Sequence, residues 1–231
     1  MLDKSFIEKI ESMAKIEIIP VNGVEYSTKS LYRVDEPECE PIRISSLKSL
    51  IALAKAELSG RKAFIIVDTP TEVSCKTGFF GNKQRDTFYK VVADLPRIEF
   101  NSFMSIENMI ISLKSKFQDT PDREYLISLL GNITDERSVS TTDDGITQQV
   151  TARSGIAMLE KQNVKAIVKL KPFRTFTSVE QPESDFLIRL KDGQAALFEA
   201  DGGAWKAEAK HNIAEYIREA VKDMPGIVVA E

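Results

Sequence analysis

Apolar residues at the start of the chain follow a helical spacing and then a strand-like one. The helical spacing predicts an amphipathic helix over residues 2–14, with Phe6, Ile10 and Met13 on one face. Residues 15–20 then read as a strand. Asn22-Gly23 is a strong hairpin turn signal, so we expect a second strand at 24–34.

The central part of the chain alternates between the two patterns. A helix is expected from Ser45 or Ser46 to Gly60, followed by a short apolar strand at 63–68. Residues 71–76 and 84–94 are predicted to be antiparallel partners.

A pair of helices is predicted over about 105–131. Ser105 and Thr120 are the expected N-caps, Pro121 suits the first helical position, and Gly131 ends the second helix.

From about 133 to 200 the pattern is strand-like, and a closing helix at 205–221 precedes a last short strand at 227–230. The predicted strands of this half are 133–142, 146–154, 165–173, 186–191 and 195–200. Hairpins dominate and strands do not alternate regularly with helices. This pattern predicts one compact α+β domain over residues 1–231, with mostly antiparallel sheet, an inserted helix pair, and N- and C-terminal helices.

The shortage of reactive side chains narrows the function. The 231 residues include one histidine, His211, and two distant cysteines, Cys39 and Cys75. Histidine is the side chain best suited to proton transfer near neutral pH and the commonest metal ligand. We therefore expect no catalytic residues, no metal site and no cofactor, and binding is the favoured class of function.

Charge and hydropathy indicate which partners and which cellular compartment to expect. Lys and Arg number 31 against 35 Asp and Glu, a formal charge of −4, so any phosphate-binding surface has to be local. Two unclustered cysteines, a charged N-terminus and no apolar run of about 20 residues predict a cytoplasmic protein without a membrane partner.

Two weak catalytic patterns have simpler explanations. Asp143-Asp144 is the best start for a carboxylate metal site, but two acidic residues before a glycine are typical of a turn. Ser45-x-x-Lys48 and Lys76-Thr77-Gly78 imitate parts of a β-lactamase site, yet the third element of that site is missing and Ser45 suits a helix cap.

The loop 78–81 is the first binding candidate. Phe79 and Phe80 lie between two glycines, and Lys76, Lys83 and Arg85 flank them. Exposed rings can stack on a base while the cations attract an anion. The alternative is a hairpin tip whose phenylalanines fold back onto the core.

The strand 164–174 is the second candidate. Its even positions are apolar, while Lys165, Lys169 and Lys171 share the other face, and Arg174 can extend this basic stripe. The alternative is an ordinary solvated sheet face.

The polar hairpin 133–154 is the third candidate. Its hydroxyls and amides, with Arg137 and Arg153, can hydrogen-bond a nucleotide. A long ribbon with little apolar surface is marginal alone, so pairing within a homo-oligomer is the favoured explanation.

The order of elements from about 46 to 230 resembles the YfdQ-like family of phage and prophage proteins. The resemblance rests on the strand 63–68, Arg85-Asp86-Thr87-Phe88, Met104-Ser105, the hairpins 133–154 and 186–200, the run 170–174 and Pro225-Gly226. It implies a phage-encoded protein in the bacterial host cytoplasm and brings no catalytic residues with it.

The leading hypothesis is therefore a non-enzymatic, homo-oligomeric phage protein that sequesters an anionic nucleotide-type immune signal or binds a host defence protein. The cations of the second and third candidates would hold phosphates, and Phe79 or Phe80 would stack a base. The alternatives are an accessory single-stranded-DNA-binding factor in recombination or replication, and a metal-dependent hydrolase of a nucleotide.

Overall fold

The N-terminal helix and hairpin form a unit of their own. The computed structural model describes residues 3–30, 40–79, 85–134, 138–143, 148–154, 157–158 and 162–231. The chain divides into two compact units, Met1–Glu38 and Cys39–Glu231. This division differs from the single compact unit expected over residues 1–231.

The first unit contains the predicted amphipathic helix and hairpin. Helix α1 covers Lys4–Ala14, and strands β1 (Ile18–Val21) and β2 (Val24–Ser27) pair antiparallel. Asn22 and Gly23 both have positive φ, 52° and 81°, as a tight two-residue hairpin turn requires. Lys29 Nζ donates a hydrogen bond to the Ala14 carbonyl at 2.7 Å, which ties the hairpin to the end of the helix.

A five-stranded sheet in the order β15-β4-β5-β6-β3 forms one part of the second unit. Its strands are β3 (Ile42–Ile44), β4 (Ala63–Thr69), β5 (Glu72–Thr77), β6 (Thr87–Val92) and β15 (Ile227–Ala230). Strands β5 and β6 pair antiparallel, as predicted, and β4 also pairs antiparallel with β5, whereas β15 joins β4 and β3 joins β6 in parallel.

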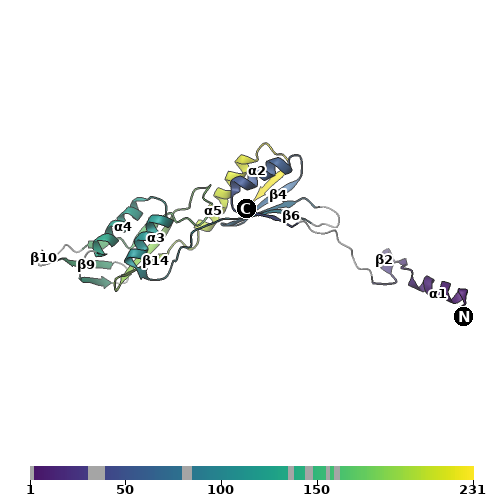
Figure 1. The fold of residues 1–231 in the computed structure, drawn as a ribbon, viewed down its shortest axis with the longest axis horizontal. Coiled ribbons are helices and arrows are strands. Elements are labelled where there is room, and N and C mark those ends of the chain that lie inside the picture. Colours follow the sequence, from purple (N-terminus) through teal and green to yellow (C-terminus); the bar gives the residue numbers. More distant parts are fainter. Residues whose placement is uncertain are drawn as a thin grey trace. The chain divides into compact units, whose positions relative to one another are not determined.

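Helices α2 (Leu47–Glu57) and α5 (Trp205–Ala220) cover one face of this sheet, as Figure 1 shows. Alternate strand residues such as Ile65, Cys75 and Tyr89 point into that layer and are fully buried with Leu50 and Ile213. Burial of each large apolar side chain stabilises the folded state by about 1.5–3 kcal/mol, so this layer is the main source of stability for the sheet.

Gly226 allows the last strand to approach the sheet closely. Its carbonyl accepts a hydrogen bond from the Ala63 N–H at 3.0 Å. A Cβ at this position would lie 2.1 Å from the Arg61 carbonyl oxygen, so only glycine fits without movement of the backbone.

A second sheet, in the order β12-β13-β14-β7, packs against the predicted helix pair. Its strands are β7 (Met104–Ser105), β12 (Ile167–Leu170), β13 (Ser184–Lys191) and β14 (Gln194–Glu199), and the helices are α3 (Ile106–Lys116) and α4 (Pro121–Thr134). The expected caps are present, because Ser105 accepts from the Asn108 N–H and Thr120 accepts from the Arg123 N–H.

The polar hairpin is part of a third, four-stranded sheet. Strand β9 (Gln148–Ser154) pairs with β8 (Ser138–Asp143), β10 (Ala157–Met158) and β11 (Gln162–Val164). The α+β class with N- and C-terminal helices and an inserted helix pair is thus confirmed. Within the described residues, no helix has the length and apolar character needed to cross a bilayer.

Candidate functional site

The basic stripe on β12 has the predicted alternation. Val168 and Leu170 are buried against the helix pair, while Lys165 and Lys169 are exposed. Strand parity therefore places Lys169 on the outer face, as expected from the sequence, while Lys165 lies just before β12.

Each lysine of the stripe, however, has a carboxylate partner within the chain. Lys165 Nζ lies 2.8 Å from Asp122, Lys169 Nζ lies 3.0 Å from Asp185, and Lys171 Nζ lies 2.9 Å from Glu180. Each pair has at least one exposed partner, and surface pairs contribute about 0–1 kcal/mol to stability, but they neutralise the charge that an incoming phosphate would meet.

Arg174 does not extend the exposed stripe, which corrects the sequence prediction. The side chain is only 7% exposed, and Nη1 donates to Glu199 at 2.8 Å. Nη2 donates to the Ser184 hydroxyl, and the guanidinium lies 4.0 Å from the Trp205 ring. The reason is a bend after β12, where the Gln181 side chain accepts from the Arg174 N–H and draws this segment inward.

Burial lowers the pKa of Arg174 to about 10, against the opposing effect of Glu199 and Asp201, so the guanidinium remains charged at neutral pH. The two carboxylates compensate that charge. Arg174 thus joins the bend after β12 to the end of β14.

The remaining stripe and hairpin predictions have mixed outcomes. Arg137 and Phe80 lie outside the described residues. Arg153 lies on β9, where it pairs with Ser138 and Met158 in the backbone register, and its side chain is outside the description. Pairing of the polar hairpin with another subunit stays a prediction.

Phe79 does not fold back onto the core. Its side chain is 65% exposed, and the Arg85 guanidinium lies 3.8 Å from its ring centroid. The same guanidinium lies 4.4 Å from the ring of Phe64, so the arginine lies between two aromatic rings. Arg85 Nη1 also donates to the Thr77 carbonyl at 3.0 Å, which fixes the orientation of the stack.

Phe64 places this stack on the sheet face that points away from α2 and α5. In the register of the sheet, Phe64 lies opposite Lys76, while Ser74 lies opposite Lys90, which in turn pairs with Arg43. Paired residues point to the same face. We call this surface, formed by Arg43, Lys62, Phe64, Lys76, Phe79, Arg85 and Lys90, the open face.

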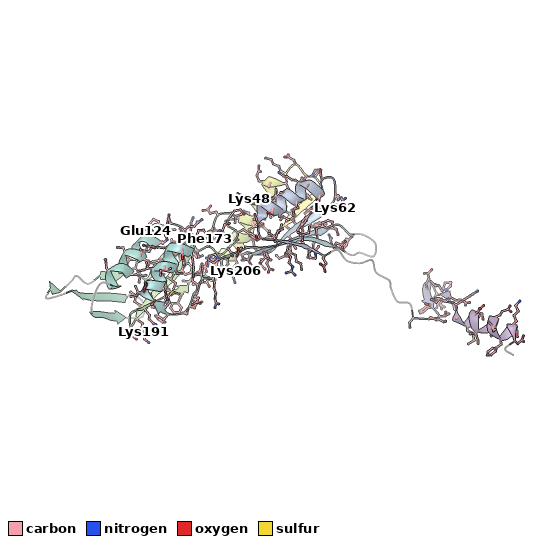
Figure 2. All side chains as sticks on the ribbon, viewed as in Figure 1. Lys48, Lys62, Glu124, Phe173, Lys191 and Lys206 are labelled. Atoms are coloured by element: carbon pink, nitrogen blue, oxygen red, sulfur yellow. The ribbon has the colours of Figure 1, made fainter. Side chains whose placement is uncertain are left out.

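The cations of the open face differ from those of the stripe, because the described part of the chain offers them no carboxylate partner. Arg43, Lys62, Lys76, Arg85 and Lys90 make no ion pair with any described residue. Lys62, labelled in Figure 2, immediately precedes β4, and its Nζ lies 6.0 Å from the Phe64 ring. Their charge is therefore available to an anion.

Ser74 adds an unsatisfied polar group beneath the open face. The residue is 5% exposed, and its Oγ has no hydrogen-bond partner among the residues that the structure describes. A buried hydroxyl without a partner costs about 1–3 kcal/mol, which a ligand atom able to reach it would recover.

The other reactive groups are poorly placed for chemistry. Cys75 is buried, and burial raises the pKa of its thiol to about 12, so it is not a nucleophile at neutral pH. His211 lies on the exposed side of α5, 3.6 Å from Glu231. Ser46 caps α2 by accepting from the Lys48 N–H at 3.2 Å. Across the described ranges, no group of three or more His, Cys, Asp or Glu side chains could hold a metal ion.

Two hollows of about 270 and 360 Å³ lie away from the open face. The smaller is lined by Ser45, Lys48 and Asp94 among others, and the larger by Arg97, Asn108 and Lys116 among others. Neither contains an aromatic–cation stack, so the open face is the better candidate for ligand binding.

Of the open-face residues, Phe79, Lys76 and Arg85 were predicted from the sequence, whereas Arg43, Lys62, Phe64 and Lys90 were not. The apolar run 63–68 looked buried on both faces, which concealed Phe64. The signal for this face was the alternation of side chains along β5 and β6. A lysine such as Lys76 or Lys90 marks the solvent face of its strand, and residues two positions away point to the same face.

Comparison of the chain with protein-family models, curated proteins and solved structures finds no match in any of the three. The resemblance to the YfdQ-like family stays a prediction.

Proposed function

We propose that the protein is a non-catalytic binding protein that holds single-stranded nucleic acid on its open face. One observation carries this proposal: the sheet face opposite the two covering helices has the Phe64–Arg85–Phe79 stack and four further cations, and none of the five cations has a carboxylate partner among the described residues. Proteins that bind single strands combine a basic surface with aromatic side chains on which bases stack.

The geometry of the stack suits a base better than a phosphate alone. Arg85 covers one side of Phe79, and most of that side chain remains exposed to a further ring. A base on Phe79 would contribute about 1–3 kcal/mol through stacking, and the nearby lysines would meet the backbone phosphates.

The distribution of charge favours a polymer over a single nucleotide. The cations extend from Lys62 before β4 to Arg43 on β3, across four strands about 4.8 Å apart. A compact nucleotide would reach only part of this surface. The sequestering role expected from Lys165, Lys169, Lys171 and Arg174 has less support, since carboxylates within the chain already pair with these side chains.

We place this activity in the cytoplasm of a bacterial host, as an accessory step in phage recombination or replication. This context comes from the resemblance to the YfdQ-like family. The single-strand-binding role itself rests on the open face.

Fluorescence anisotropy with a labelled oligothymidylate tests the proposal. Arg85→Ala and Phe79→Ala are each expected to weaken binding by about 5- to 100-fold, through loss of stacking and of a cation. Lys169→Ala is the matched control, because it removes an exposed lysine of the second sheet and is expected to leave affinity within about twofold.

Equal losses from Lys169→Ala and Arg85→Ala would transfer the site to the basic stripe and contradict the proposal. Tight binding of one mononucleotide that salt does not weaken and a change of base abolishes would instead support the nucleotide hypothesis.

A further inference from the structure

The first unit exposes all of its large apolar side chains that the structure describes. On α1, Phe6, Ile7, Ile10 and Met13 are 47–70% exposed, and no residue of the helix is buried. On the hairpin, Ile19 and Tyr26 lie opposite each other on one face and are about half exposed. An apolar surface of this kind marks an interaction site.

The unit is too small to be stable by itself. It spans Met1–Glu38, and chains below about 40 residues usually need disulfides, a metal or association with another chain. Residues 1–38 contain neither Cys nor His, and its described part holds no cluster of acidic metal ligands. Of these three sources of stability, association with another chain is the one that remains for the first unit.

The edges of the hairpin argue against association by strand addition. Val21 pairs with Val24 beside the two-residue turn, so the next pair, Pro20 and Glu25, directs its backbone polar groups outward. Proline has no N–H to offer on the β1 edge, and Glu25 places a charge on the β2 edge. The side-chain faces are the remaining contact surface.

Charges beside the apolar stripe of α1 fit a second copy of the chain. At 100° per residue, Lys9 lies on one side of the stripe formed by Phe6, Ile7, Ile10 and Met13, and Glu11 lies on the other. When two such helices pack in parallel about a two-fold axis, the Lys9 side of each faces the Glu11 side of the other. An antiparallel pair would bring like charges together.

The same charges fit a lipid surface poorly. Residues 3–30 contain four lysines against five carboxylates, whereas helices that lie on anionic membranes carry a basic polar face.

We propose that the first unit is a self-association module in which α1 packs in parallel against α1 of a second copy. This inference is independent of the open face and of the proposed nucleic-acid binding.

Sedimentation of the nuclease-treated full chain tests the module. The protein is expected to sediment as a dimer at micromolar concentration, and Ile10→Asp as a monomer. Ser12→Asp is the matched control, since it adds the same charge to the opposite, polar side of α1 and is expected to remain dimeric. A monomeric wild type, a monomer that pellets with phosphatidylglycerol vesicles, or a dimeric Ile10→Asp would each overturn the proposal.

A charge exchange tests the parallel arrangement without placing a charge in the apolar stripe. Lys9→Glu and Glu11→Lys are each expected to raise the dimer dissociation constant about tenfold, because each turns two attractive pairs into repulsive ones. The double exchange is expected to restore the wild-type value. If the double variant is as weak as the single ones, the parallel arrangement is wrong.

Discussion

Arg174 shows how a single side chain can join two segments of the second unit. Its guanidinium donates to Glu199 and Ser184, and the Ser184 hydroxyl donates to Asp201 at 2.6 Å. Burial of a charge is costly unless partners compensate it, and here they come from β13 and the end of β14. The cluster therefore depends on all its members together.

Removal of Arg174 should leave two carboxylates without their cation. Arg174→Ala is expected to lower the free energy of unfolding by about 3–5 kcal/mol in urea denaturation. Arg174→Lys should be intermediate, because an ammonium keeps the charge but loses the fork geometry. Arg97→Ala is the control, since Arg97 is 89% exposed in its pair with Glu99 and should change stability by less than about 0.5 kcal/mol. Equal effects would contradict a structural role for the buried pair.

Asp201 makes the same cluster sensitive to acid. Burial alone would raise the pKa of this carboxyl, but the Ser184 hydroxyl, the N–H groups of Gly203 and Trp205, and Arg174 together lower it. A folded-state pKa below the unfolded value of about 3.9 stabilises the fold above that pH, and the stabilisation is lost as pH falls through the folded value. Asp201→Asn should therefore be less stable at pH 7, with a smaller further loss of stability between pH 5 and 2. An unchanged acid profile in chemical denaturation would contradict this assignment.

How far the site could be predicted depended on each residue's neighbours. The exposure of Lys169 followed from alternation alone, because it lies within the regular strand β12, whereas Lys165 is exposed but lies before that strand. The burial of Arg174 could not be predicted, since it depends on a bend and on partners from β13 and β14. Phe79 was a correct candidate, but its stack on Arg85 and Phe64 requires the register between β4 and β5.

At the scale of elements, helix caps were the most predictable feature. Ser46, Ser105 and Thr120 each accept a backbone N–H at the start of a helix. Capping depends only on residues within one turn, so the local sequence contains all the necessary information. The parallel pairs β3–β6 and β15–β4 were not predicted, because the two strands of each pair lie far apart in the sequence.

Thr120 also reaches beyond its own helix. Its hydroxyl accepts from Arg123 and donates to the Lys169 carbonyl on β12 at 3.3 Å. Thr120→Ala is expected to lower the free energy of unfolding by about 1–2 kcal/mol. Ser115→Ala, at an exposed position within α3, is the control and should stay within about 0.5 kcal/mol. If both variants unfold at the same urea concentration, the cap is not stabilising.

A substitution at Gly226 tests whether β15 depends on close approach to β4. A methyl group there would meet the Arg61 carbonyl at 2.1 Å, so Gly226→Ala should force β15 away from β4. Hydrogen exchange of the Ile227 to Ala230 amides is expected to accelerate, while exchange within β13 and β14 stays unchanged. Unchanged protection of β15 would show that the backbone adapts without cost.

At the scale of the whole molecule, local charge matters more than net charge. The chain carries a formal charge of −4, yet the cations of the open face lack carboxylate partners among the described residues. Composition predicted no general attraction to nucleic acid, and the open face makes such an attraction local. Its strength should therefore depend strongly on ionic strength.

Salt dependence measures how many phosphates the open face contacts. Five contacts predict a slope of about −3.5 for log affinity against log salt, so affinity should fall about 100-fold between 50 and 200 mM salt. Lys76→Ala and Lys90→Ala should each reduce the slope by about 0.7, whereas Lys169→Ala should leave it unchanged. A slope near zero in the wild type would contradict phosphate contacts on this face.

The parallel pairing of β15 with β4 also determines when the sheet can be completed. Ala63 lies near the beginning of the second unit and Ile227 near its end. Strand β4 is therefore synthesised long before β15, its parallel partner. Until residues 227–230 leave the ribosome, β4 has an unpaired edge with apolar side chains on both faces. Such an edge recruits other strands, so nascent chains stalled before Gly226 are expected to need chaperones more than finished ones.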